Sequence, residues 1–315
     1  MISSDACFDS QAASSLIKLK ALELGFSACG IAWVEPLTED GRYLQKWLKE
    51  ERHGRMAYLE NNFEKRVNPS LLAENARSVI VVLLNYSVET EINGGLIKIA
   101  KYAQGNDYHF LVKQFLQQLL RFIEDEIAPV QGRVFCDSAP VFERRWAQKA
   151  GLGWLGLNRC LIHPQFGSFC FIGELIVDLE LTYDSPLEGD CGFCGKCELS
   201  CPTKAIKADG MLDASQCISY HTVELKDEIP QDFRASLNGS IVGCDRCQDV
   251  CPWNKKASTH TSSLWKVDEE LMKMSDDDWK QLTNSQFKKK FSKSALTRLG
   301  YKKLMQNMQY VLEKH

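Results

Sequence analysis

The sequence predicts an α+β protein in which an N-terminal mixed α/β domain precedes a small cysteine-rich domain and a short helical tail. Strand-length apolar runs alternate with helical apolar stripes over residues 1–185. Eight cysteines then fall within residues 186–255, and the segment 256–315 is polar with segregated charges. A chain of 315 residues is long enough for about two domains. We therefore expect boundaries at 1–185, 186–255 and 256–315.

Apolar spacing in the first domain predicts its individual elements. Two helices are expected from helical spacing: residues 13–24, ended by Gly25, and the stripe Leu111, Phe115, Leu119 and Phe122, preceded by Asp107 as a cap. Pro140 suits the first turn of a third helix over residues 140–150, closed by Gly151. The expected strands are 27–34, 79–84, 133–136 and 169–181, and the second is apolar enough to be buried on both faces.

Composition and charge exclude several classes of protein. Hydrophobic residues make up 44% and charged residues 25%, and the net charge is −3, as in ordinary soluble proteins. Contact with nucleic acid would therefore need a local basic patch. The longest apolar run has six residues, against about 20 for a membrane-spanning helix. The N-terminal residues show no basic and apolar export signal, so we expect a cytoplasmic protein without a membrane partner.

The chain has 13 cysteines, and their spacing is the strongest signal in the sequence. The first run is Cys191-x2-Cys194-x2-Cys197-x3-Cys201-Pro202, the spacing of bacterial ferredoxins. The second run is Cys244-x2-Cys247-x3-Cys251-Pro252, with Cys217 alone upstream. Eight thiolates suffice for two [4Fe–4S] clusters, so the domain is expected to be ferredoxin-like.

The last cysteine of each ferredoxin run binds the other cluster. That rule assigns Cys191, Cys194, Cys197 and Cys251 to one cluster, and Cys201, Cys217, Cys244 and Cys247 to the other. Structural zinc sites or disulfides are the alternatives, but zinc motifs lack the x3-Cys-Pro end. Two clusters conduct single electrons and need a reaction partner within residues 1–185.

No familiar cofactor motif appears in that first domain. Neither Gly-x-Gly-x-x-Gly nor a phosphate-binding loop is present, and the histidines lack metal-ligand spacing. Asp137 lies between a strand and a helix, where it is either a helix N-cap or a catalytic acid. The glycine-rich stretch 151–158 either allows close approach of a bulky ligand or forms a tight connection. Cys136, Cys160 and Cys170 are expected to be core thiols.

Motifs in a fixed order resemble those of a known family. They are Glu64-Lys65-Arg66-x-x-Pro69, Tyr102-Ala-x-Gly-x-Asp-Tyr-His109, Asp137-Ser-Ala-Pro-x-x-Glu143-Arg144, Gly151-Leu-Gly-Trp-x-Gly-x-Asn158, Gly167-Ser-x-x-Phe-x-Gly-Glu174 and the eight cysteines. Over residues 10–255 the chain resembles epoxyqueuosine reductase, the enzyme of the last step of queuosine synthesis in tRNA. One departure is Leu157, where that family usually has lysine.

The resemblance implies a cofactor and a reaction. Cobalamin would be held base-off between the first domain and the ferredoxin-like domain, and electrons from the clusters would reduce it to cob(I)alamin, which removes the epoxide oxygen. Asp137 would be the proton donor, with its pKa raised by desolvation under the corrin. The cobalamin contacts carried over by motif are Arg66, Ala100, Asp137, Asn158, Leu161, Ile172, Ser219 and Asp245.

Partners follow from the same resemblance. The substrate would be tRNA carrying epoxyqueuosine in its anticodon loop, gripped by seven cations of the tail: Lys288, Lys289, Lys290, Lys293, Arg298, Lys302 and Lys303. A solvated helix is the alternative for this stretch. The extruded base would stack on aromatics such as Trp154 or Tyr220.

The electron donor would be a reductase, flavodoxin or ferredoxin that the sequence does not identify, and we expect a monomer. The rival functions are a cobalamin-dependent reductive dehalogenase and a ferredoxin-type electron carrier without chemistry of its own.

Overall fold

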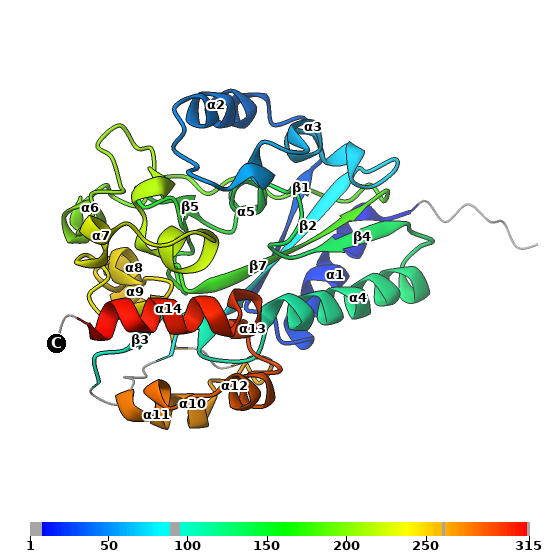
Figure 1. Ribbon diagram of the computed structural model, residues 1–315. Coiled ribbons are helices and arrows are strands. Elements are labelled where there is room, and N and C mark those ends of the chain that lie inside the picture. The colour runs from blue at the N-terminus through cyan, green and yellow to red at the C-terminus, as the bar shows by residue number, and fades with distance from the viewer. Residues whose placement is uncertain (1–7, 89–94, 260–261, 314–315) are drawn as a thin grey trace, which may run out of the picture.

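The computed structural model describes residues 8–88, 95–259 and 262–313, so Cys7 lies outside the described residues (Figure 1). Its centre is an antiparallel four-stranded sheet of order β1-β2-β7-β4. The strands are β1 (Ala28–Trp33), β2 (Ser78–Asn85), β4 (Gly132–Phe135) and β7 (Cys170–Val177). All eight residues of β2 are buried, as its apolar run predicts, because β2 lies between two strands and both faces of the sheet are covered.

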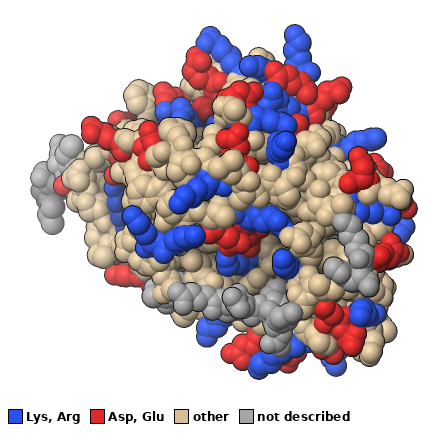
Figure 2. Space-filling view, turned by 90° about the vertical axis from the view of Figure 1, so that its left-hand side faces the viewer, with Lys and Arg blue, Asp and Glu red and all other residues tan. Residues whose placement is uncertain are grey.

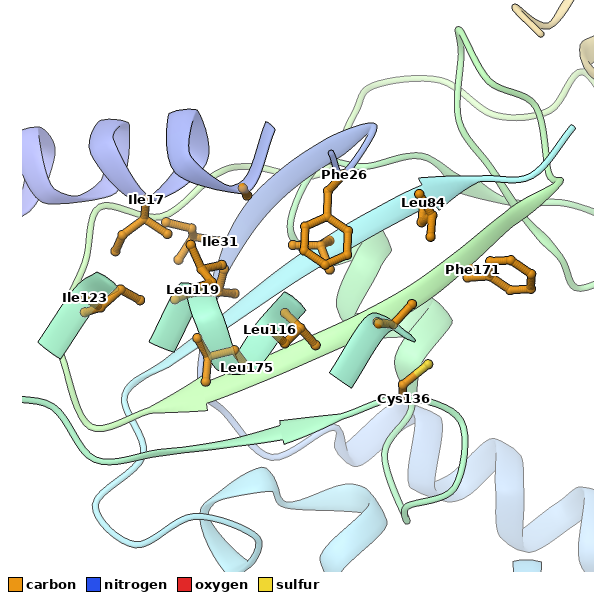
Figure 3. Close-up of a cluster of buried hydrophobic side chains, with 14 of the residues drawn as sticks. Ile17, Phe26, Ile31, Leu84, Leu116, Leu119, Ile123, Cys136, Phe171 and Leu175 are labelled. Atoms are coloured by element: carbon orange, nitrogen blue, oxygen red, sulfur yellow. The ribbon is translucent and has the colours of Figure 1, made fainter. Parts of the chain in front are cut away.

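Helices α1 (Ser10–Glu23) and α4 (Tyr108–Glu126) cover one face of this sheet. Figure 3 shows Ile17 of α1 and Leu116 of α4 pointing toward the strands. The opposite face packs against α5 (Glu143–Lys149), whose Trp146 is fully buried. Also in this half are α2 (Thr38–Lys49), α3 (Phe63–Val67) and the hairpin of β5 (Trp154–Leu155) and β6 (Leu161–Ile162).

Two expected details of these helices are corrected. The buried face of α4 is Val112, Leu116, Leu119 and Ile123, one position away from most of the predicted stripe. Leu111, Phe115 and Phe122 are only partly buried on its flank, because the sheet selects one side of a broad apolar surface. The third helix begins at Glu143 rather than residue 140, because an irregular turn that includes Asp137 at positive φ precedes it. Asp107 does cap α4 as predicted.

A second core joins three segments that are distant in the sequence. It contains Ile97 and Ile99, then Ile218 to Val242, then apolar residues of the tail from Leu271 to Val311. Strand β3 (Lys98–Ile99) pairs in parallel with β8 (Ser240–Val242) at its centre. The tail helices are α10 (Glu269–Lys273), α11 (Asp276–Lys280), α12 (Asn284–Lys290), α13 (Leu296–Leu299) and α14 (Tyr301–Leu312). The tail therefore packs as part of the body, below and across it in Figure 1.

Short helices and loops carry the clustered cysteines at one end of the molecule. Cys197 lies in α6 (Lys196–Ser200), Cys247 lies in α8 (Arg246–Asp249), and Cys251 caps α9 (Pro252–Lys256). Helix α7 (Gln231–Arg234), which holds no cysteine, lies with them at the left of Figure 1. Single 3-10 or π turns elsewhere are Ala57–Leu59, Pro69–Leu71, Lys101–Ala103, Ala214–Gln216 and Tyr220–Glu224. Figure 2 shows Lys and Arg side chains intermixed with Asp and Glu over this side. Among the described residues, no helix is both long and apolar enough to cross a membrane.

Candidate active site

Asp137 lies in the turn between β4 and α5 and adopts a left-handed conformation with a φ of 58°. It is not the N-cap of the following helix, because α5 begins at Glu143 and Phe142 occupies the cap position. The Asp137 side chain is 55% exposed. Its carboxylate accepts hydrogen bonds from Tyr108 Oη and His109 Nε2, each at 2.8 Å. The carboxylate is therefore both fixed in place and open to a ligand.

A line of charged groups continues behind Asp137. His109 Nδ1 lies 2.6 Å from Asp107 Oδ1, and Arg298 Nε donates to the other Asp107 oxygen at 3.2 Å. Both ring nitrogens of His109 thus face carboxylates, and only the imidazolium can donate a proton to each. Burial alone would lower the pKa of His109, but the hydrogen bonds to Asp107 and Asp137 outweigh it and raise the pKa.

The pKa of Asp137 moves in the direction opposite to that expected from desolvation by a corrin. Burial raises it, but hydrogen bonds from His109 and Tyr108 outweigh burial and lower the pKa below its ordinary value. In the protein alone, this geometry and the two opposed pKa shifts favour a carboxylate at Asp137 and an imidazolium at His109. The transferable proton lies between them.

Two further carboxyl groups lie beneath Asp137. Glu143 Oε1 accepts a hydrogen bond from the Asp137 backbone N–H. Burial, followed by the negative charge of Asp137, raises the pKa of Glu143 to about 8. Glu174 on β7 is fully buried, and burial together with neighbouring Glu143 raises its pKa well above the ordinary value.

Residues from several elements surround the open side of Asp137. Arg66 on α3 is buried, and its Nε has no hydrogen-bond partner among the described residues. Tyr58 is 52% exposed, and burial of its hydroxyl, together with charges that include Asp137, raises its pKa to about 12. Tyr102 lies within electrostatic reach of both Asp137 and Asp245. The structure therefore brings Arg66, Asp137 and Asp245 around one region.

The other cobalamin contacts predicted from the motifs lie in varied surroundings. Ala100 and Leu161 are buried. Asn158 is also buried and lines a cavity shared with four of the cysteines. Ile172 and Ser219 are half-buried. Asp245 accepts the Lys101 backbone N–H at 2.7 Å, and burial raises its pKa to about 6.

The eight clustered cysteines form two groups. Cys191, Cys194, Cys197 and Cys251 line one small cavity, which Leu157 also borders. In the other group, Cys217 lies within electrostatic reach of Cys201, and both Cys244 and Cys247 lie within reach of Cys217. Cys251 of the second run thus lies with the first run.

Three further cysteines were expected in the core. Cys136 is buried there and Cys170 is half-buried on β7. Cys160 departs from the expectation, because its side chain contacts Cys247.

The glycine-rich stretch 151–158 forms a tight connection. Gly153 has a φ of 151°, and a Cβ there would lie 2.3 Å from the Ile162 carbonyl oxygen. Tyr220 cannot stack a base as proposed, because its ring is buried against Gly54. Trp154 is half-buried, with its ring centroid 5.1 Å from that of Trp253.

Three of the seven tail cations have partners within the protein. Lys303 is buried and donates to the Asp227 carbonyl, and burial lowers its pKa to about 8. Arg298 pairs with Asp107, and Lys290 Nζ lies 3.5 Å from a Glu270 oxygen. The four that remain as exposed candidates for phosphate contact are Lys288, Lys289, Lys293 and Lys302.

Comparison with known proteins identifies the family that this chain resembles. A family model described as a 4Fe-4S double cluster binding domain matches residues 190–254, and one described as epoxyqueuosine reductase QueG, DUF1730, matches residues 66–138. The epoxyqueuosine reductase of Cellulophaga algicola is 47% identical, covering 95% of this chain and 97% of its own. That of Leadbetterella byssophila is 45% identical, covering 95% and 98%.

Solved structures of epoxyqueuosine reductases are similar to this chain along most of its length. A crystal structure of epoxyqueuosine reductase with an epoxyqueuosine-modified tRNA-Tyr stem loop aligns with a TM-score of 0.87 at 26% identity, over 95% of this chain and 80% of that one. The Bacillus subtilis enzyme, with its catalytic aspartate loop swung out of the active site, aligns at 0.85 and 26% over the same shares. A B12-dependent reductive dehalogenase aligns at only 0.51 and 18%, over 80% and 33%, and shares the fold alone.

A double-cluster domain joined to a fixed, exposed acid defines an iron–sulfur oxidoreductase. The two-zinc alternative is not supported, since the matching domain is one that binds 4Fe-4S clusters. The chain belongs to the epoxyqueuosine reductase family. The dehalogenase and the plain electron carrier are correspondingly not favoured.

Four residues of this site are not among those that the sequence predicts to be functional. Tyr108, His109, Glu143 and Glu174 all occur in the motifs that carried the resemblance, yet none was given a role. Their signal was therefore present. What the sequence lacked was the antiparallel pairing of β4 with β7, which brings the Asp137 turn near Glu174, and the packing of α4 on that sheet, which brings His109 to Asp137.

Proposed function

We propose that this chain reduces epoxyqueuosine to queuosine at the wobble position of tRNA, with Asp137 as proton donor and cobalamin held base-off beside it. The observation that carries this proposal is the exposed Asp137 carboxylate, which is hydrogen-bonded to His109. Tyr102 lies within electrostatic reach of this carboxylate and of Asp245, the residue that follows Cys244. The relative crystallised with a modified stem loop supports tRNA as the substrate.

The cysteine groups fit two [4Fe–4S] clusters with exchanged fourth ligands. Cys191, Cys194, Cys197 and Cys251 would hold one cluster, and the cavity that they share supports this set. Cys201, Cys217, Cys244 and Cys247 would hold the other, as their mutual electrostatic influence supports. Each set would take one ligand, Cys251 or Cys201, from the end of the other run, as in two-cluster ferredoxins.

The region around Asp137 fits a large polar cofactor. The Arg66 Nε is a buried donor with no partner in the described part of the chain, and a ligand acceptor would satisfy it. Tyr58 offers an exposed ring, while Ser219 and Asp245 approach from the cysteine-rich domain. Ala100, Asn158, Leu161 and Ile172 complete the set carried over by motif. Bound there, cobalamin fed by the clusters would supply a strongly reducing, nucleophilic cobalt centre.

The protein's own part in the reaction is to manage protons. Removing the epoxide oxygen as water consumes two electrons and two protons, and an unprotonated oxygen is a poor leaving group. Asp137 would donate at the substrate, and the imidazolium of His109 would return a proton from Nε2 to the same carboxylate. Asp107 and Arg298 hold His109 in the orientation that this requires.

Nucleoside analysis tests the proposal. The protein is reconstituted anaerobically with iron, sulfide and cobalamin, then reduced and incubated with tRNA containing epoxyqueuosine. Mass spectrometry of the digested tRNA is expected to show loss of one oxygen atom from the modified base. Unchanged epoxyqueuosine with a fully loaded protein would overturn the proposal. A donor of the reductase, flavodoxin or ferredoxin type can replace the chemical reductant in the same assay.

A further inference from the structure

The carboxyl groups of Glu143 and Glu174 have no part in the proton transfer described above. Glu174 is on β7, opposite Val81 on one side and Phe135 on the other, and is fully excluded from solvent. Neither of its carboxyl oxygens has a hydrogen-bond partner of ordinary geometry among the described residues. An unpaired carboxylate buried there would be strongly destabilised, so Glu174 is expected to be protonated.

Glu143 lies between Glu174 and the Asp137 turn. It is in the first turn of α5, is a close neighbour of Glu174, and accepts the backbone N–H of Asp137. Like charges this close cannot both ionise, so the two glutamates are expected to hold one proton between them. Protonated Glu174 then donates to one Glu143 oxygen, which leaves Glu143 Oε1 free to accept from the Asp137 backbone N–H.

The turn itself needs such a holding group. Asp137 has positive φ, which is unfavourable for a residue other than glycine, and its side chain alone is restrained by Tyr108 and His109. Among the described residues, the backbone–backbone hydrogen bonds within the turn are short-range ones, from Ser138 to Cys136 and from Val141 to Ala139, and Lys113 Nζ donates to the Ser138 hydroxyl at 2.8 Å. In the Bacillus subtilis relative the corresponding loop was found swung out.

We propose that the Glu143–Glu174 carboxyl pair is a latch that holds the Asp137 turn in its working position. Glu143 is then a positioning residue that acts through the Asp137 backbone, and Glu174 acts through Glu143. Only the expected effect of the latch on turnover rests on the proposed role of Asp137. The position of the turn can be measured without tRNA or cofactors.

Hydrogen exchange of the full-length protein tests the latch directly. Glu143→Ala is expected to raise the exchange rate across residues 136–142 about tenfold, because it removes one hydrogen bond. A tenfold change corresponds to about 1.4 kcal/mol. Glu143→Gln is the matched control, because its amide oxygen can still accept from Asp137, and its exchange should stay at the wild-type level. Unchanged exchange in Glu143→Ala, or an equal rise in the central strand β2, would overturn the latch.

Glu174 variants provide the second arm. Glu174→Gln keeps a donor toward Glu143 and is expected to protect the turn, whereas Glu174→Leu removes the donor and should loosen residues 136–142. Equal protection in both variants would contradict the role of Glu174.

Turnover of the loaded enzyme then separates the two proposals. With the latch lost, kcat should fall at least tenfold with little change in KM for tRNA, and Glu143→Gln should restore it. Loosened exchange with unchanged kcat would leave the latch standing and remove Asp137 from the reaction.

Discussion

Asp137 works within a line of side chains that the core itself fixes. Tyr108 stacks on Phe171 with ring centroids 4.1 Å apart, and Phe171 belongs to the first hydrophobic core. The hydroxyl of Tyr108 therefore approaches Asp137 from a rigid position. On the other side, His109 is 5% exposed and is held by Asp107. An acid oriented in this way loses little entropy when substrate arrives.

Asp137→Asn should abolish most turnover while leaving the cofactors in place. Asparagine keeps the size of the side chain but cannot carry the proton, and a positioned acid typically contributes about 10²–10⁴ in rate. Iron content, corrin absorbance and single-turnover rates are measured together. Asp125→Asn, an exposed change on α4, is the control. Near wild-type turnover in Asp137→Asn would exclude it as the proton donor.

His109 should make stability depend on pH. Because the fold raises its pKa, the imidazolium contributes fully below the ordinary value of about 6.5, and the contribution is lost as pH rises through the raised value. Wild type should exceed His109→Gln by about 1–3 kcal/mol in free energy of unfolding under mildly acid conditions, from charged hydrogen bonds. Denaturant titrations across pH check this. A difference that stays constant or grows with pH would contradict the ion pair.

Asp137 and the cysteines could be predicted at this scale because local spacing marks them. Tyr108 and His109 could not be assigned, since their contact with Asp137 spans 28 or 29 positions of the chain. Lys303 was misassigned because a lysine on an amphipathic helix looks the same in sequence whether its end is solvated or buried.

At the scale of elements, the sequence predicts the four strands of the central sheet, but not their pairing or the short strands β3, β5, β6 and β8. The apolar run of β2 predicts burial on both faces, yet a continuous apolar run is also typical of strands in parallel sheets. The sheet is antiparallel throughout, so Asp137 follows an edge strand that pairs with β7. The rule for the carboxyl ends of parallel strands therefore does not explain its position. The position of Asp137 follows instead from the turn that precedes α5, in which the Asp137 backbone N–H donates to Glu143.

The two cysteine runs should exchange one ligand each. Cys251→Ala is expected to lose the same cluster as Cys191→Ala, and Cys201→Ala the same cluster as Cys217→Ala, with about half of the iron lost in each case. Iron analysis and electron paramagnetic resonance of the reduced variants distinguish the two clusters. Pairing of Cys251 with Cys244 in the spectra would show that each run binds its own cluster.

The whole molecule is held together by a core that no single domain supplies. Ile97 and Ile99 meet Leu237, Ile241 and the tail helices there. Trp265, at the start of the tail, is buried in the other core beneath the sheet. Composition does predict a helical tail, but not that its apolar face closes the body. Contacts between segments so far apart in the sequence produce no local pattern from which they could be predicted.

The exposed lysines of the tail should govern the salt dependence of tRNA binding. Each of Lys288, Lys289, Lys293 and Lys302 that contacts a phosphate contributes about 0.7–0.9 to the slope of log affinity against log salt. Alanine at these positions should lower the slope by that amount apiece, measured by titration at several salt concentrations. Lys303→Met, a buried control, should leave the slope unchanged. Equal slopes for all variants would place the tRNA on another face.

Dependence of the reaction on cobalamin tests the central claim most directly. Protein reconstituted with both clusters is divided, and cobalamin is added to one half only before reduction and incubation with tRNA containing epoxyqueuosine. We predict that the first half retains the corrin through gel filtration and forms queuosine, while the second half forms none. Queuosine formed equally without cobalamin, or a fully metallated protein that retains no corrin, would contradict the account.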